Sequence, residues 1–203
     1  LFVSHSLSAI QSLCDRAIWL DAGRIMEDGD VHIVTQRYHQ AAVPMINVPL
    51  ELNPNRSGDG SVRITAVAIE SLDDDKVIRP TSKLKITLHY RSGSPLRYPQ
   101  FSITIYDHVN NVGLISLHSE TSGGLPEELP PEGSVSCITE PLDLTPGKCY
   151  LNLTVLRGGV KADYIQHAAY FDVEATDVFG TGRLPERDWV VCLREYTWSL
   201  DGT

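Results

Sequence analysis

The stretches FSITIYD at residues 101–107 and CYLNLTV at residues 149–155 decide the fold. Apolar and polar side chains alternate in both, which is the pattern of a β-strand with one buried and one solvated face. Five more stretches share this period of two: residues 62–64, 84–89, 115–118, 135–137 and 169–173. Turn residues separate them without an intervening helical period. The sequence therefore predicts a mainly β fold, an antiparallel β-sandwich of immunoglobulin-like type.

The first forty residues follow a different pattern. Residues 16–20 and 24–27 are strand-like and flank a tight turn, whereas helical spacing is found at residues 6–14. Asp30 is placed to cap a second short helix that ends near Gln40. This part is predicted to be α/β, and we expect it to be marginally stable or mobile because its strands lack covering neighbours.

Proline recurs three times between these two parts. Proline fixes φ and removes a main-chain donor, so residues 41–60 are predicted to be a semi-extended linker. The predicted organisation is an α/β piece at residues 1–40, the linker, and the sandwich at residues 61–203. The chain starts without Met or a charged leader, so we expect residue 1 to be an interior point of a longer protein.

Composition excludes several classes of function. Lys and Arg number 17 against 26 Asp and Glu, for a net charge of −9. Nucleic-acid backbones and anionic membrane surfaces demand clustered cations, so neither is an expected partner. No apolar run approaches 18 residues, so no transmembrane helix is predicted.

Metal and disulfide sites are not expected either. The four cysteines form no CxxC or CxxH pair, and Cys137 and Cys149 lie in strand-like runs where they are predicted to be core hydrophobes. Three carboxylates at Asp73, Asp74 and Asp75 are hard oxygen ligands, but they precede a lysine in a predicted turn and are interpreted as solvated.

The opening segment resembles the end of an ABC-transporter ATPase domain. The similarity is carried by VSH at residues 3–5, LCDR at residues 13–16 and IWLDxGxI at residues 18–25. The resemblance implies that His5 is the switch histidine of the H-loop, which contacts the γ-phosphate of ATP in that family.

The later segments resemble the C-terminal domain of Wzt proteins, the ATPase subunits of O-antigen polysaccharide ABC exporters. They are GSVRIT at residues 60–65, FSITIYD at residues 101–107 and GKCYLNL at residues 147–153. The resemblance implies a cytoplasmic β-sandwich, peripheral to the inner membrane through the transporter, that binds the exported glycan and couples it to transport. It also implies two partners, the O-antigen polysaccharide and the membrane permease subunit.

The Walker A, signature and Walker B motifs are absent from this sequence. Without the amides and lysine that cradle phosphates, we expect no ATP hydrolysis and no cofactor, because ATP and Mg²⁺ would belong to the full-length parent. No catalytic constellation and no metal site is predicted.

A glycan site is predicted on one sheet face. In an immunoglobulin-like order, the strands at 101–107, 113–119, 149–156 and 168–174 form one sheet, whose outward side is nearly uncharged and rich in hydroxyls and aromatic rings. The predicted carbohydrate-binding residues are Ser102, Thr104, Tyr106, Ser116, His118, Tyr150, Asn152, Thr154 and Tyr170, with Asp172 at the margin. Such a face also suits a plain solvated sheet.

Two functions stay open at this point. The first is a non-catalytic glycan-recognition module, reading the chain or its modified terminus. The alternative is a structural domain that dimerises the ATPase. The resemblance implies a homodimer and permits exchange of the last strand between its two copies, for which the aromatic tail with Trp189 and Trp198 is a candidate. The bound sugar is not specified by the sequence.

Overall fold

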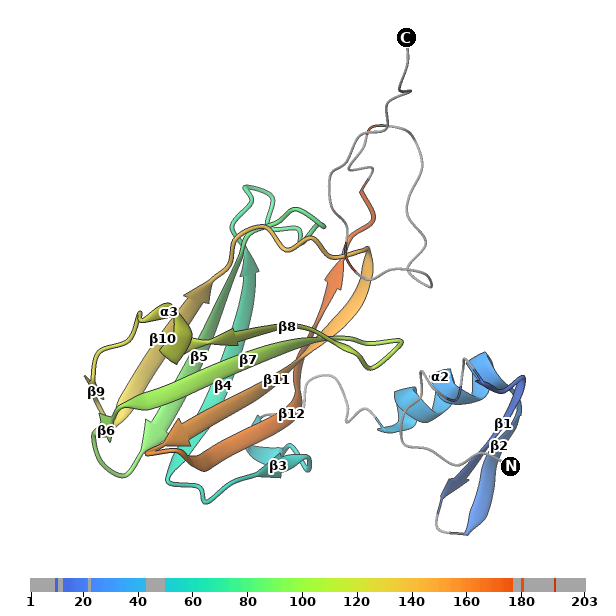
Figure 1. Cartoon of the computed structure of the whole chain (residues 1–203), viewed down its shortest axis with the longest axis horizontal. Coiled ribbons are helices and arrows are strands. Elements are labelled where there is room, and N and C mark those ends of the chain that lie inside the picture. The colour runs from blue at the N-terminus through green and yellow to red at the C-terminus, as the bar shows by residue number, and fades with distance from the viewer. Residues whose placement is uncertain are drawn as a thin grey trace, which may run out of the picture.

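The computed structural model describes residues 10, 13–21, 23–42, 50–176, 180 and 192. It is mostly β, with antiparallel sheets throughout (Figure 1). Four predicted features lie outside the described residues: His5, the first residues of the helix predicted at 6–14, Trp189 and Trp198.

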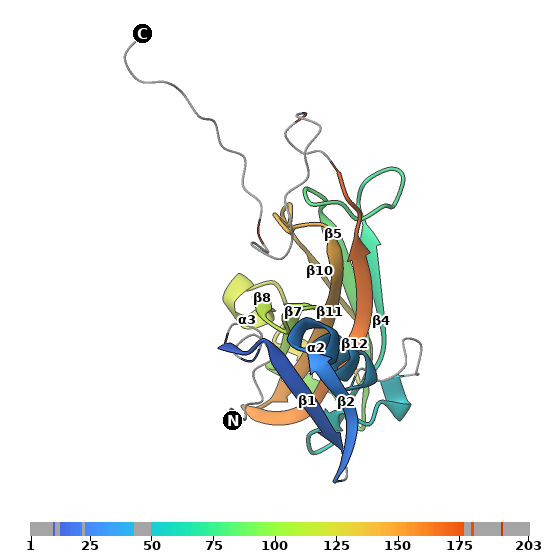
Figure 2. The ribbon, with the colours of Figure 1, turned by 90° about the vertical axis from the view of Figure 1, so that its right-hand side faces the viewer.

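The N-terminal part is a hairpin followed by a helix. Strands β1 (Arg16–Asp21) and β2 (Arg24–Asp30) pair antiparallel, and α2 (Val31–Ala42) follows directly. The Asp30 carboxylate caps α2 by accepting from the main-chain N–H of His32 at 2.9 Å. Figure 2 shows the hairpin and helix together as one small unit.

Two sheets form the sandwich. One has the strand order β10-β5-β4, and the other β3-β12-β11-β7-β8. The three-stranded sheet consists of β4 (Val62–Ser71), β5 (Leu84–Ser92) and β10 (Glu132–Ile138). The five-stranded sheet consists of β3 (Arg56–Ser57), β7 (Pro99–Asp107), β8 (Gly113–His118), β11 (Gly147–Arg157) and β12 (Val160–Val173).

Short elements complete the fold. They are η1 (Leu50–Leu52), α3 (Ser119–Ser122), and the small pair β6 (Leu96–Arg97) with β9 (Glu128–Leu129). All seven strands expected from the alternation are present. In Figure 1 the strands of the five-stranded sheet cross obliquely over those of the three-stranded sheet.

The core lies between the two sheets. Ile86, Ile105, Leu151 and Leu153 are fully buried, which is the outcome expected when each strand turns its apolar positions inward. Cys149 is fully buried and Cys137 packs against the same core, so both are the core hydrophobes that the sequence predicts.

Residues 50–60 fold onto the sandwich, although the sequence predicts them to belong to the linker. Leu50 is buried, and the Arg56 guanidinium pairs with the fully buried Asp163 carboxylate at 2.5 and 2.8 Å. Asp163 also accepts from the Ile64 main-chain N–H at 2.8 Å. Because this pair joins residues 107 positions apart, the local proline pattern gives no sign of it.

Candidate functional site

Four rings on the outward face of the five-stranded sheet stack into one cluster. Tyr106 of β7 and Tyr150 of β11 are cross-strand partners whose rings lie 5.0 Å apart and almost parallel. The ring of His167 stacks on Tyr150 at 4.2 Å, and Tyr170, also from β12, lies 5.9 Å from Tyr150. We call Tyr106, Tyr150, His167 and Tyr170 the aromatic platform.

Tyr150 is the centre of the aromatic platform and supports the other rings. Its side chain is only 2% exposed, and its hydroxyl donates to Asn111 Oδ1. Burial raises the pKa of Tyr150 far above its ordinary value, and burial raises that of Tyr170 as well. Both phenols are therefore neutral at physiological pH. Tyr106 and Tyr170 are half-buried and offer ring surface to solvent.

A bulge in β12 brings His167 to this face. Leu151 pairs with Ala169 and Leu153 with Ile165, so the three residues between them oppose Asn152 alone. His167, the middle one, has φ of 52° and turns its ring outward onto Tyr150. His167 is not among the site residues that the alternation predicts, because an odd position has the inward parity of Ile165 and Ala169. The break in alternation at residues 166–168 was the available signal.

Beside the platform lies a polar group, the hydroxyl cluster, formed by Ser102, Thr104, Ser116 and His118. The His118 ring is 3.1 Å from Ser102 Oγ through Nδ1 and 2.8 Å from Ser116 Oγ through Nε2. Thr104 and Ser116 hydroxyls are 3.1 Å apart across β7 and β8. The cluster thus presents donors and acceptors that adapt to a hydroxylated ligand.

Ser116, His118 and Glu120 also stand in the order of a serine, histidine and acid triad, with His118 Nδ1 3.4 Å from Glu120 Oε1. Ser102 approaches that same nitrogen more closely, and Ser116 and Glu120 are both exposed. Activation of a nucleophile relies on a preorganised site that excludes water. The arrangement therefore suits hydrogen bonding better than covalent chemistry.

The structure brings the predicted site residues onto one face but does not leave all of them accessible. Ser102 and Asn152 are buried. Asn152 accepts the His167 main-chain N–H at 2.8 Å, so its side chain shapes the bulge. Thr154 is half-buried, and Asp172 is exposed and pairs in register with Lys148. The accessible members are Thr104, Tyr106, Ser116, His118, Thr154 and Tyr170.

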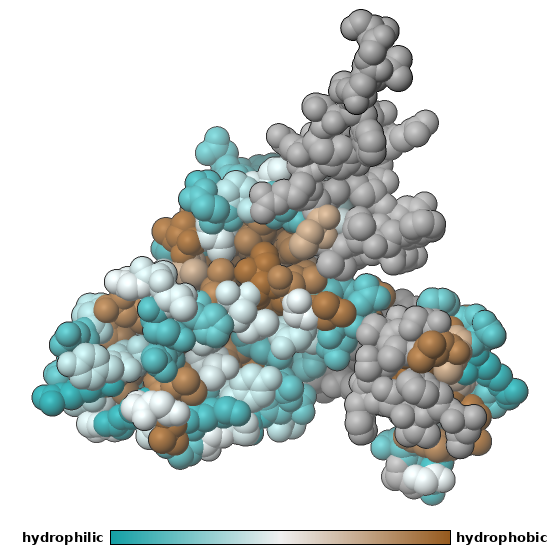
Figure 3. All heavy atoms as spheres, in the orientation of Figure 1, coloured by the Kyte–Doolittle hydropathy of each residue, from teal (hydrophilic) through white to brown (hydrophobic). Residues whose placement is uncertain are grey.

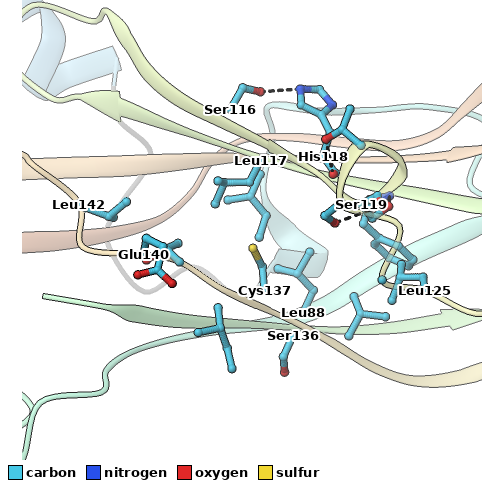
Figure 4. Close-up of a pocket in the computed structure, with 18 of the residues that line it drawn as sticks. Leu88, Ser116, Leu117, His118, Ser119, Leu125, Ser136, Cys137, Glu140 and Leu142 are labelled. Atoms are coloured by element: carbon cyan, nitrogen blue, oxygen red, sulfur yellow. Dashed lines mark hydrogen bonds between the residues drawn. The ribbon is translucent and has the colours of Figure 1, made fainter.

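An apolar cleft opens between the edge strands β8 and β10. Its volume is about 490 Å³, and Leu88, Leu117, Cys137 and Leu142 line it with Ser116 and His118 at the rim. Figure 3 shows apolar side chains exposed along this opening, and Figure 4 shows Leu117, Leu88 and Cys137 pointing into it. We call it the side cleft. It shares His118 with the hydroxyl cluster.

In the turn that holds Asp73, Asp74 and Asp75, one of the three carboxylates is engaged by an arginine. Asp75 is paired with Arg79 at 2.6 and 3.0 Å, and this pairing lowers the Asp75 pKa to about 2. Among the described residues, no group of three or more His, Cys, Asp or Glu side chains is arranged to hold a metal ion.

Fold and site together define an immunoglobulin-like β-sandwich with a neutral aromatic and hydroxyl face. Residues 53–184 match the model of the Wzt C-terminal domain family, so the chain belongs to that family. A solved structure, described as the C-terminal domain of Wzt, superposes with a TM-score of 0.58 at 14% identity. The match covers 77% of this chain and 97% of that one, and it shows the fold.

Curated relatives match over a short stretch. The teichoic acids export ATP-binding protein TagH of Listeria innocua is 50% identical over 40 residues, which are 20% of this chain and 12% of the relative. The O-antigen export system ATP-binding protein RfbB of Klebsiella pneumoniae is 42% identical over 41 residues, 20% and 17% respectively. The chain thus spans less than a fifth of the length of either relative. None of the helices among the described residues is long and apolar enough to span a membrane.

Proposed function

We propose that this chain is a non-catalytic glycan-recognition module of a polysaccharide ABC exporter, with its site on the outward face of the five-stranded sheet. The observation that supports this most is the aromatic platform beside the hydroxyl cluster. Pyranose rings bind proteins through their C–H faces on aromatic rings and through their hydroxyls on adaptable polar groups. The half-buried rings of Tyr106 and Tyr170 supply the first, and Thr104, Ser116 and His118 supply the second.

The charge of this face supports a neutral or weakly charged glycan. Among the predicted site positions, only Asp172 carries a formal charge, and it faces Lys148 in the register. The glycan we propose is an O-antigen polysaccharide, because RfbB is named for O-antigen export. The family membership of residues 53–184 is consistent with this assignment.

The remaining parts of the exporter follow from the same proposal. ATP and Mg²⁺ would bind only in a full-length parent, whose catalytic motifs are not in this sequence, and the permease subunit would be reached through that parent. The hairpin leaves Ile18, Leu20, Ile25 and Met26 between 49% and 63% exposed. Exposed apolar side chains at this density suit a surface covered by the rest of an ATPase domain. The module would then work in the cytoplasm, peripheral to the inner membrane.

Calorimetric titration of the chain with O-antigen polysaccharide, purified from the organism that encodes it, tests the proposal. Tyr106→Ala should weaken binding about tenfold, because a stacked ring contributes on the order of 1 kcal/mol or more. Tyr98→Ala is the matched control, since Tyr98 is 64% exposed and lies outside this face. Absence of binding by the unsubstituted chain, or equal losses in the two variants, would contradict the site.

A second candidate function, dimerisation of the ATPase, is favoured by one contact. Cys192 forms an isolated antiparallel bridge with Leu144, which lies close in sequence to Leu142 of the side cleft. We propose that the segment around Cys192 makes this contact with a second copy of the chain, as in an exchanged strand. Sedimentation before and after deletion of residues 187–203 tests this, and an unchanged dimer would count against exchange.

A further inference from the structure

The bulge in β12 holds His167 in a conformation that needs support. A φ of 52° places His167 in the left-handed region, which costs a residue with a Cβ atom on the order of 1 kcal/mol. On one side, the side chain of Asn152 accepts the His167 main-chain N–H. That contact does not hold the preceding residue, Gln166, whose main chain is bound by other residues.

Gln166 is held by the segment through which the chain enters the sandwich. We call residues 50–57 the lead-in segment. The Gln166 main-chain N–H donates to the Asn55 carbonyl at 3.0 Å, and the Gln166 carbonyl accepts from Asn53 Nδ2 at 3.1 Å. The Asn53 side chain is 8% exposed, and its Oδ1 accepts from the Asn55 N–H at 2.8 Å. Both ends of this amide are therefore engaged, which fixes its orientation.

The lead-in segment is itself anchored to the core. Arg56 donates to the Leu50 carbonyl at 2.8 Å, to the Ile64 carbonyl at 2.9 Å and to both carboxylate oxygens of Asp163. Arg56 and Asp163 are 8% and 0% exposed at their side chains. A buried pair with this many hydrogen bonds resists displacement, so the lead-in segment is a rigid support for the bulge.

We infer that Asn53 is a positioning residue of the glycan site: its amide fixes Gln166, and thereby sets the His167 ring over Tyr150 and beside Tyr170. That the ligand is a glycan rests on the proposed function, whereas the positioning of the ring rests on the contacts alone. His167 Nδ1 is 3.1 Å from the Tyr170 hydroxyl, so a shift of His167 moves Tyr170, a half-buried ring of the aromatic platform. Asn53 reaches these rings only through the main chain of β12.

Because Asn53 and Asn55 hold Gln166, a change in the lead-in segment shifts the bulge and the His167 ring. Linkage makes the effect reciprocal, and a ligand that tightens the platform stabilises the contacts of the lead-in segment. Slower hydrogen exchange at the Gln166 amide on addition of polysaccharide is the expected sign.

The test compares Asn53→Ala and Asn53→Asp in the whole chain by NMR, first without ligand. Asn53→Asp keeps the acceptor for the Asn55 N–H and loses the donor to Gln166, so it isolates the contact in question. Both variants should weaken the nuclear Overhauser contacts between the rings of His167 and Tyr150. Asn55→Ala is the matched control, because the contacts described for Asn55 use its main chain alone.

Titration with purified O-antigen polysaccharide then completes the test. Both Asn53 variants should bind about tenfold more weakly than the unsubstituted chain, and Asn55→Ala should bind as well as it does. Unchanged ring contacts in both Asn53 variants would overturn the positioning role. Lost ring contacts with unchanged affinity would overturn its importance to the site. Lost ring contacts in a chain that never binds the polysaccharide would support positioning and overturn the proposed function instead.

Discussion

The two outward faces of the sandwich are made from strands with the same alternation of side chains, yet the side chains that they present differ. On the three-stranded sheet, charged residues face one another in the register: Glu70 lies opposite Lys85, and Glu132 opposite Arg91. On the five-stranded sheet the corresponding positions carry rings and hydroxyls, and a polar side chain such as Tyr150 is 2% exposed.

This difference separates a face of hydrated side chains from a face on which side chains pack against one another. Exposed charged pairs on a sheet keep their hydration and contribute little to stability. The aromatic platform instead takes the Tyr150 phenol out of water and places His167 at positive φ, and both features cost free energy. A face that is merely solvated has no need of either.

The largest expected effect is a difference in the free energy of unfolding between substitutions on the two faces. Tyr150→Ala should lower the free energy of unfolding by about 3–5 kcal/mol, because it leaves a cavity among the rings of Tyr106, His167 and Tyr170. His89→Ala, on the exposed face of β5, should change it by less than about 0.5 kcal/mol. Urea denaturation measures both. Similar losses in the two variants would remove the distinction between the faces.

Alkaline pH gives the next effect. Burial raises the pKa of Tyr150 and Tyr170, so the folded state keeps their protons after the unfolded chain begins to lose them near pH 10. Stability is thus fully present below pH 10 and falls as pH rises above it, with a slope that approaches about 1.4 kcal/mol per pH unit for each tyrosine.

Tyr170→Phe should make this decline shallower, because the contribution of one tyrosine to the slope is removed. Denaturant titrations between pH 9 and 11 provide the slopes. A Tyr170→Phe slope equal to that of the unsubstituted chain would show that the surroundings of Tyr170 do not raise the pKa of its phenol.

The smallest effect compares two serines. Ser116 and Ser136 are both exposed and each lies near a threonine hydroxyl, at 3.1 Å from Thr104 and 3.0 Å from Thr87. Ser116→Ala should weaken polysaccharide binding about three- to tenfold, the range for one hydrogen bond, and Ser136→Ala should not change it. Equal affinities of the two variants would exclude the hydroxyl cluster from the site.

The alternation of side chains predicted the seven strands, the strands that share the five-stranded sheet, and the outward position of Tyr106, Tyr150 and Tyr170. It predicted these because the period of two is a local property of each strand. Alternation does not reveal stacking, however, and it gave no indication that Tyr150 would be buried by its neighbours.

His167 and the lead-in segment were out of reach for a different reason. His167 depends on a bulge that changes the side-chain parity, and residues 50–60 depend on the Arg56–Asp163 pair across 107 positions. The three prolines between residues 41 and 60 predicted a linker there, although residues 50–60 of that stretch fold onto the core.

The most direct test of the central claim is a map of amide chemical shifts in the whole chain as O-antigen polysaccharide fragments are added. We expect the largest shifts at residues 102–106, 116–118, 150–154 and 164–170, all on the five-stranded sheet. The amides of β4, β5 and β10 should move little. Shifts concentrated on the three-stranded sheet, or no shifts at saturating polysaccharide, would contradict the account.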